Sequence, residues 1–220
     1  MPHPDLFPIS TIKIRTPYRH REWVTRTRLI EALHDDLEKQ LLLVVAPSGY
    51  GKTTLLVDFS HDSEFPACWL SLDVLDREPQ RFLNYLIAAV AERYPEFGKD
   101  SLAVLEGMQS FERDGEHILV ALSNEIEEKI KEHFVLILDD YHIVGDVLII
   151  QQLISRLLQL AGENFHLILA SHNLPDIPDI SRLTIKNLVG GLSYEELAFQ
   201  PNEVQGFFSP YEHQVVRFRA

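Results

Sequence analysis

The 220-residue sequence predicts an α/β fold of three layers, in which helices cover both faces of a mostly parallel central sheet. Short apolar runs typical of strands buried on both faces, helical patterns between them, and a glycine-rich turn after the first run predict this fold. The expected strands are LLLVVA at 41–46, ACWLSLD at 67–73, FVLILDD at 134–140 and HLILAS at 166–171.

Helical spacing separates these runs. The first helix is expected from Thr27, which can act as its N-cap, and Asp76 with Pro79 opens another. Further helices are expected at 52–61, near 116–132 and at 147–160.

The remaining segments give weaker patterns. Residues 95–115 show no clear period. After Pro175, LTIKNL (183–188) and YEELAF (194–199) could be short strands, and PNEVQGFF (201–208) could be a helix begun by its proline.

The same patterns predict the domain organisation. We expect residues 1–20, which are proline-rich, to form an extended arm, and residues 21–200 to form one domain. Residues 201–220 are expected to begin a following helical or winged segment, or a tail.

Composition narrows the class of protein. With 33 acidic and 20 basic side chains the net charge is −13, which disfavours a domain that grips nucleic acid by its phosphates. The single cysteine, Cys68, agrees with a reducing compartment, so we expect a cytoplasmic protein. The apolar runs are too short for a membrane helix, and no membrane contact is expected.

The clearest motif is APSGYGKTT at 46–54, which matches G-x-x-x-x-G-K-[ST] with Ala46 in place of the first glycine. In such a loop the backbone N–H groups surround a polyphosphate, and the N-terminus of the next helix favours the anion. Lys52 would approach the β- and γ-phosphates, and the Thr53 hydroxyl could ligate Mg²⁺. The expected nucleotide-binding residues here are Pro47, Ser48, Gly49, Tyr50, Gly51, Lys52, Thr53 and Thr54.

An acidic pair ends the strand at 134–140. The carboxyl ends of strands in α/β sheets lie where ligands bind. We expect Asp139 to hold Mg²⁺ opposite Thr53, and Asp140 to polarise the water that attacks the γ-phosphate, which makes Asp140 and Lys52 the candidate catalytic residues. The alternative is an acidic turn that caps the next segment.

Four other residues give weaker signals. His172, at the end of the next strand, could sense the γ-phosphate or belong to a plain loop. Arg26 and Arg28 could approach a nucleotide's base or ribose, or lie on the surface. His142 has no second histidine at ligand spacing, so we do not expect a metal site there.

These motifs together resemble the ATPase domain of the MalT-like, LuxR-type large ATP-binding transcription regulators, a branch of the STAND signalling ATPases. The resemblance spans roughly residues 20–208. The segments that carry it are VTRTRLIEAL, LLLVVAPSGYGKTTLL, CWLSLDVLDREPQRFLNYL, FVLILDDYHIV, FHLILASHNLPDI and LSYEELAFQPNEVQGFF.

The resemblance implies a P-loop NTPase fold of the ASCE type, in which a further strand lies between the strand before the phosphate loop and the strand that ends in the acidic pair. It also implies an ADP-bound monomer at rest and self-association in the ATP state when an inducer is present. DNA would be bound only through further domains that this sequence does not contain.

One position departs from the family pattern. The family usually has arginine where this sequence has His172. Histidine is largely neutral at pH 7, whereas arginine is always charged and contacts phosphate through two donors, so hydrolysis is expected to be slow or absent. An arginine finger is expected from another subunit or from Arg182.

The sequence thus favours a domain that binds ATP or ADP with Mg²⁺ and acts as a nucleotide-dependent switch in a transcriptional regulator, with weak ATPase activity. One alternative is a P-loop kinase, which the scarcity of arginine after residue 113 disfavours. The other is a non-catalytic interaction module that keeps a nucleotide as a structural ligand.

Overall fold

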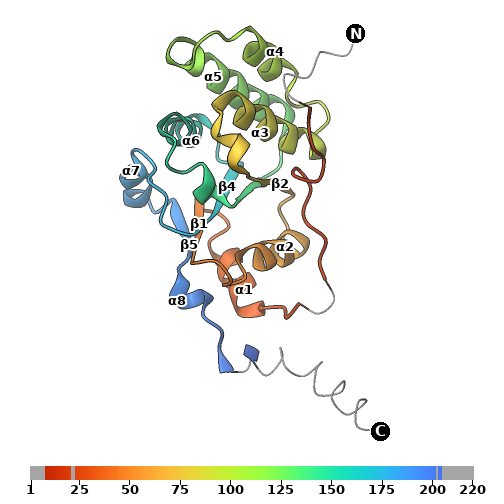
Figure 1. Ribbon diagram of the computed structural model, residues 1–220, viewed down its shortest axis with the longest axis vertical. Coiled ribbons are helices and arrows are strands. Elements are labelled where there is room, and N and C mark those ends of the chain that lie inside the picture. Colours follow the sequence, from red (N-terminus) through yellow and green to blue (C-terminus); the bar gives the residue numbers. More distant parts are fainter. Residues whose placement is uncertain (1–7, 21–22, 202, 205–220) are drawn as a thin grey trace.

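The computed structural model describes residues 8–20, 23–201 and 203–204 (Figure 1). Its centre is a five-stranded sheet in the order β2-β3-β4-β1-β5, in which every neighbouring pair is parallel. The strands are β1 (Leu41–Val45), β2 (Ala67–Ser71), β3 (Phe134–Asp139), β4 (Phe165–Ser171) and β5 (Val189–Leu192). The strand β4 lies between β1 and β3, as the resemblance implied.

The strands form where they do because apolar side chains cover both faces of the sheet. In β1, Leu41 and Leu43 pack into one hydrophobic cluster, while Leu42 and Val44 pack into another on the opposite face. Alternation of side chains along a strand places successive residues on opposite faces. A continuous apolar run is therefore the pattern that a sheet covered on both sides requires.

Helices make up the two outer layers. The helices α1 (Thr27–Asp35) and α2 (Lys52–Asp62) cover one face, and α3 (Pro79–Arg93), α5 (Phe111–Lys129) and α6 (Leu148–Leu160) cover the other (Figure 1). The shorter helices are η1 (Val74–Arg77), α4 (Lys99–Gly107), η2 (Tyr141–Ile143), α7 (Ile180–Ile185) and α8 (Tyr194–Leu197). The predicted three-layer α/β fold is confirmed.

The start of α1 differs from the prediction. Thr27 is the first helical residue, and the N-cap position is held by Arg26, which makes no side-chain capping bond. The Arg26 carbonyl accepts the first bonds of the helix, from the N–H groups of Leu29 and Ile30. The side chain of Arg26 is directed elsewhere, as described below.

The unclear stretch at 95–115 contains a helix that sequence periodicity missed. The N-terminus of α4 is satisfied by a buried carboxylate from α5, because Glu125 accepts hydrogen bonds from the N–H groups of Gly98, Asp100 and Ser101. The capping residue therefore lies 24 to 27 residues away in sequence, on another helix, where a search for local capping residues does not find it.

The two short strands expected after residue 182 are wrong. Most of segment 183–188 belongs to α7 or its C-terminal turn, segment 194–199 contains α8, and β5 lies between them. The missed strand contains Gly191, whose φ is +126° and whose substitution by any larger residue would place a Cβ 2.1 Å from the Leu43 carbonyl oxygen. Glycine permits this close approach to β1, but it also removes the apolar pattern by which strands are recognised.

Residues 1–7 of the N-terminal arm and most of residues 201–220 lie outside the described residues. The expected helix at 201–208 falls there except for residues 201, 203 and 204. The described part of the arm, residues 8–20, has no helix or strand, and the Lys13 carbonyl accepts a hydrogen bond from the Ser71 N–H at 2.8 Å. None of the helices in the described ranges combines the length and the hydropathy that a bilayer crossing demands.

Candidate functional site

The segment 46–54, called here the phosphate loop, connects β1 to α2 at the carboxyl edge of the sheet. Gly49 and Gly51 adopt φ values of +87° and +77°, and a Cβ at either position would meet nothing within 4 Å. Glycine is needed at both positions because of the left-handed backbone, and not because a side chain would clash with a neighbour. Gly51 is the N-cap of α2, so the free N–H groups of this eleven-residue helix face the loop.

Lys52 lies inside the phosphate loop. Its side chain is buried, and Nζ donates to the carbonyl oxygens of Ala46 at 2.6 Å and Pro47 at 3.1 Å. Burial lowers the pKa of the ammonium, while the carboxylates of Asp140 and Asp139 act in the opposite direction. The ammonium thus lies where it can exchange carbonyl partners for phosphate oxygens.

Thr53 and Asp139 meet across the site. Thr53 Oγ1 donates to Asp139 Oδ2 at 2.9 Å, although the two residues are 86 positions apart. Asp139 is 3% exposed, and burial together with the neighbouring Asp140 raises its pKa from 3.8 to about 6. A hydroxyl and a buried carboxylate form an oxygen donor pair of the kind that Mg²⁺ prefers, and a cation would offset the unfavourable burial of the charge.

The remaining predicted loop residues face the site in different ways. Pro47 and Ser48 are exposed, and Tyr50 and Thr54 are partly buried. Pro47 and Ser48 lie on the exposed bend before Gly49, so what they offer a ligand is mainly backbone.

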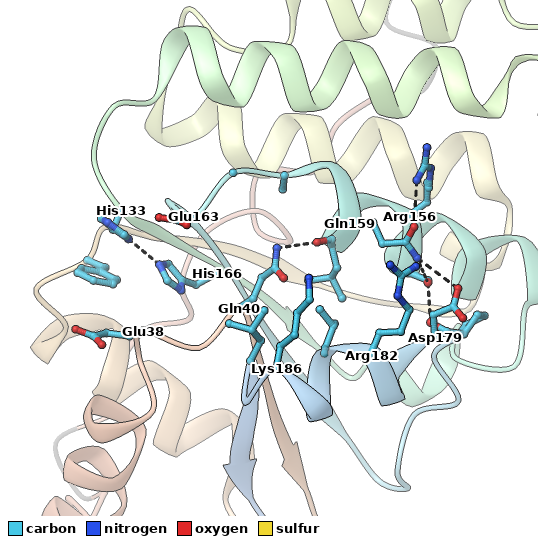
Figure 2. A pocket seen from close by; sticks show the side chains of 18 residues that line it. Glu38, Gln40, His133, Arg156, Gln159, Glu163, His166, Asp179, Arg182 and Lys186 are labelled. Atoms are coloured by element: carbon cyan, nitrogen blue, oxygen red, sulfur yellow. Dashed lines mark hydrogen bonds between the residues drawn. The ribbon is translucent and has the colours of Figure 1, made fainter.

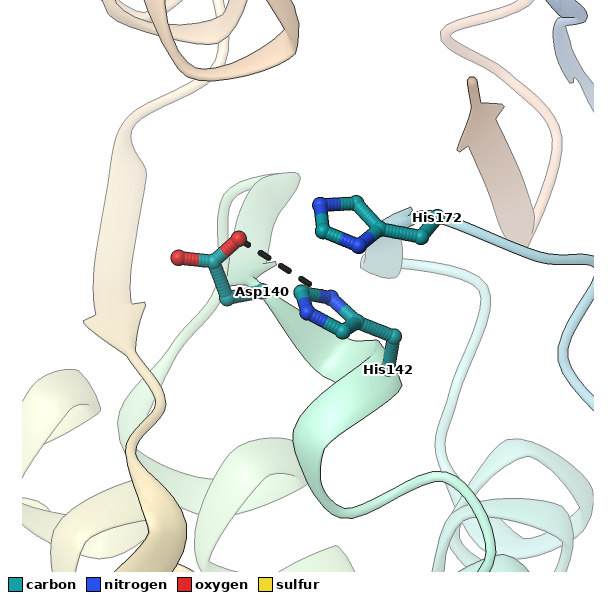
Figure 3. A group of neighbouring side chains, drawn as sticks. All are labelled: Asp140, His142 and His172. Atoms are coloured by element: carbon teal, nitrogen blue, oxygen red, sulfur yellow. Dashed lines mark ion pairs between the residues drawn. The ribbon is translucent and has the colours of Figure 1, made fainter. Parts of the chain in front are cut away.

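Asp140 and two histidines lie beside this pair (Figure 3). Asp140 has a φ of +59° and its Oδ1 lies 3.9 Å from Nδ1 of His142. The rings of His142 and His172 stack with centroids 3.5 Å apart and an interplanar angle of 18°. Sequence spacing offered His142 no second histidine for a metal site, but the fold places His172 beside it, because the ends of β3 and β4 lie together.

Arg26 borders a small pocket next to the phosphate loop. This pocket has a volume of about 240 Å³ and is lined by Trp23, Val24, Arg26, Gly51, Thr54, Leu55, Asp58 and Phe199. Pockets for drug-sized ligands run from about 300 Å³ upward, so this one suits a single ring system.

The side chain of Arg26 is held in place from one end. It is 5% exposed, its Nη2 donates to the Ala198 carbonyl and to Glu203 at 3.1 Å each, and its guanidinium lies 4.4 Å from the centre of the Phe199 ring. Its Nε and Nη1 have no hydrogen-bond partner among the described residues. Of the alternatives considered for Arg26, the surface position is excluded; Arg28 is partly exposed and bonds to the Glu196 carbonyl.

The aromatic walls of this pocket were not predicted. Trp23 and Phe199 lie 176 residues apart in the sequence. Phe199 ends the segment YEELAF, which carries part of the family resemblance, and Trp23 directly precedes the segment VTRTRLIEAL, but neither segment indicates an aromatic pocket wall.

A larger cavity of about 720 Å³ opens at the other, amino edge of the sheet (Figure 2). It is lined by residues that precede strands, such as Gln40, His133 and Glu163, and by Arg156, Arg182 and Lys186. Arg182 therefore lies at the edge opposite to Lys52, and the expectation that it could serve as an arginine finger within its own chain is wrong.

Comparison with known proteins shows which proteins the chain is similar to. No family model matches the chain. The sequence is 31% identical over 199 residues to the HTH-type transcriptional regulator MalT of Yersinia enterocolitica, and 29% identical over 196 residues to MalT of Klebsiella pneumoniae. Each match covers 89% of this chain, which spans about a fifth (21%) of the length of these curated relatives.

A solved structure shares the fold. The Aeropyrum pernix ORC1 protein, determined in complex with DNA, superposes with a TM-score of 0.51 at 17% identity, covering 91% of this chain and 51% of that one. This structural similarity confirms the fold class only, because at 17% sequence identity it does not indicate a shared function. The resemblance to MalT-like regulators inferred from the motifs is confirmed by the sequence matches.

Proposed function

Since the chain is similar to MalT transcriptional regulators over 89% of its length, we propose that it is the nucleotide-binding regulatory part of such a regulator. In this proposal residues 21–200 form the ATPase unit, bind ATP or ADP with Mg²⁺, and switch between a resting and an active state. The inducer, self-association in the ATP state and contact with DNA through further domains belong to the same proposal.

The observation that carries the proposal is the convergence of three groups at one edge of the sheet. The left-handed glycine loop and the Lys52 ammonium belong to one segment, and that segment meets Asp139, 86 residues away from Thr53, through the Thr53 Oγ1–Asp139 Oδ2 hydrogen bond of 2.9 Å. Each group matches one part of a metal-bound nucleotide: loop amides and lysine for the phosphates, oxygen donors for the cation.

The base would enter the pocket bordered by Arg26. The pocket shares Gly51 and Thr54 with the phosphate loop, so a nucleotide whose phosphates lie in the loop can reach it. Phe199 and Trp23 offer aromatic surface for a purine, and the free donors of Arg26 offer hydrogen bonds to its ring or to the ribose.

Mg²⁺ fits the donor set that the chain presents. Thr53 Oγ1 and Asp139 Oδ2 would hold it, and it would supply charge neutralisation for the phosphates. Asp140, one residue further and partly exposed, would orient the attacking water. Because His172 stands where the family usually has arginine, turnover is expected to be slow.

Two observations weigh against a P-loop kinase. Arg156 pairs with Glu116 at 2.5 Å, and Arg182 lines the cavity at the opposite edge, so neither is placed to act as a lid arginine on a transferred phosphoryl group.

The direct test is calorimetric titration of ATP and ADP into the wild type and Lys52→Ala, with Lys186→Ala as a control that removes a lysine from the opposite edge. Hydrogen bonds to charged groups contribute about 1.5–3 kcal/mol, so Lys52→Ala is expected to weaken ATP binding by about tenfold to a hundredfold. Lys186→Ala should bind as the wild type does. Equal affinity in all three proteins would remove the phosphate loop from the proposal.

A further inference from the structure

The group formed by Asp140, His142 and His172 has a composition that nucleotide binding does not require (Figure 3). Each side chain is partly buried, and each offers one ligand atom, with all three atoms lying within 4.8 Å of one another. Asp140 and His142 belong to the turn after β3, whereas His172 follows β4. The group is therefore assembled by the sheet from segments 30 residues apart.

One histidine nitrogen of this group, Nδ1 of His142, is buried, has no hydrogen-bond partner among the described residues and can bind a further partner. A second stacked pair in the chain, His133 and His166, differs in this respect, because its rings hydrogen-bond to each other at 2.9 Å and His166 also bonds to the Lys39 carbonyl. Stacked histidines can therefore be fully hydrogen-bonded. The pair at the carboxyl edge differs because Nδ1 of His142 has no hydrogen-bond partner among the described residues.

The spacing suits a shared metal ion. Two nitrogens bonded to one Zn²⁺ at about 2.0–2.1 Å in a tetrahedral site lie about 3.3 Å apart, and one ligand atom from each of the three residues already lies within 4.8 Å of the other two. The rings are nearly parallel, so each must turn for its lone pair to point at a common ion. The carboxylate of Asp140 lies on the same side, with Oδ1 3.9 Å from Nδ1 of His142.

We propose that Asp140, His142 and His172 form a binding site for a divalent transition-metal ion of the Zn²⁺ type, distinct from the Mg²⁺ position. Two imidazoles and one carboxylate are a donor set that Zn²⁺, Co²⁺ and Ni²⁺ accept readily, whereas Mg²⁺ prefers oxygen donors such as Thr53 and Asp139. Three protein ligands leave the fourth position of a tetrahedral ion open for water or a phosphate oxygen.

Occupation of this site would act on turnover. An ion bound to Asp140 engages the carboxylate that, in the proposed function, orients the attacking water, so zinc is expected to slow hydrolysis without releasing the nucleotide. This consequence rests on the proposed function, but binding of the metal does not.

The test measures the metal alone on the full chain, free of any affinity tag and of nucleotide, with millimolar Mg²⁺ present to occupy the oxygen site. Zn²⁺ affinity is measured against a chromophoric chelator, and Co²⁺ is added to report tetrahedral coordination by its visible absorption. The variants are His172→Asn, His172→Arg and, as a matched control from the other stacked pair, His133→Asn. Circular dichroism checks that each variant is folded.

The wild type is expected to bind one equivalent of Zn²⁺ and to give the intense Co²⁺ bands of a tetrahedral site. Both His172 variants should lose at least about tenfold in Zn²⁺ affinity, the size of effect that loss of metal-site groups produces, and His133→Asn should lose none. Absence of the Co²⁺ bands in the wild type, or equal Zn²⁺ affinity in His172→Asn and the wild type, would overturn the assignment. Lys52→Ala should keep the zinc site, so failure of nucleotide binding and failure of metal binding are separable.

Discussion

The burial of Asp139 leads to a prediction about stability as well as function. Replacing Asp139 by Asn keeps the size of the side chain and an oxygen that can accept from Thr53, but removes the charge. The pKa of Asp139 is raised from 3.8 to about 6, mainly by burial. The buried carboxylate is therefore an unfavourable group in the folded state at neutral pH.

The magnitude and the sign follow from linkage. A pKa that rises on folding means that the folded state favours the protonated carboxyl. The stability that protonated Asp139 contributes is therefore fully present below about pH 4 and is lost as the pH rises through about 6. A shift from 3.8 to about 6 corresponds to about 3 kcal/mol at about 1.36 kcal/mol per unit. We expect Asp139→Asn to be more stable than the wild type by about 1–3 kcal/mol at pH 8, since the buried amide retains part of the cost.

Thermal unfolding in EDTA at pH 8 and pH 4.5 measures this difference. For a domain of this size about 1 kcal/mol moves the midpoint by about 2–4 °C, so the variant should melt several degrees higher at pH 8 and close to the wild type at pH 4.5. Asp35→Asn, which changes an exposed aspartate at the end of α1, should have little effect at either pH. A variant that is less stable than the wild type at pH 8 would show that burial does not dominate the energy of Asp139.

Two further predictions concern Asp140 and Gly191. Asp140→Asn should keep the affinity for ATP and lose turnover, because asparagine tolerates the φ of +59° but cannot act as a base. Phosphate release measures the turnover, and unchanged hydrolysis would exclude Asp140 from the reaction. Gly191→Ala should cost at least about 3 kcal/mol of unfolding free energy in denaturant, because its Cβ would lie 2.1 Å from the Leu43 carbonyl oxygen at a φ of +126°. The control Gly107→Ala, whose Cβ would meet no atom within 4 Å, should cost little. Similar unfolding midpoints for the two variants would contradict the close approach of β5 to β1.

The sequence was most informative where one segment carries its own signal. The strands β1, β3 and β4 are buried on both faces, and such strands must be continuous apolar runs, so their positions were predicted within a residue or two. The phosphate loop was equally visible, because backbone requirements at Gly49 and Gly51 and the position of Lys52 are all local.

The sequence was least informative where the cause of a structure lies on another segment. The helix α4 is capped by Glu125 from α5, and β5 is defined by its approach to Leu43. The contact of His142 with His172 has the same origin, since no spacing along the chain relates them. Patterns of spacing detect ligands that share a helix or a turn, and they miss ligands that the sheet brings together.

The order of the strands explains why His172 matters more than its place in a loop suggests. Because β4 lies between β1 and β3, the residue that follows β4 lies at the same edge of the sheet as the phosphate loop and Asp139. Neighbouring strands are about 4.8 Å apart, so a side chain at that position lies within one or two strand spacings of the residues that follow β1 and β3. An arginine there would contact phosphate with a fixed charge. A histidine contacts its neighbour His142 instead, and a metal ion bound as proposed would connect the end of β4 to the turn after β3.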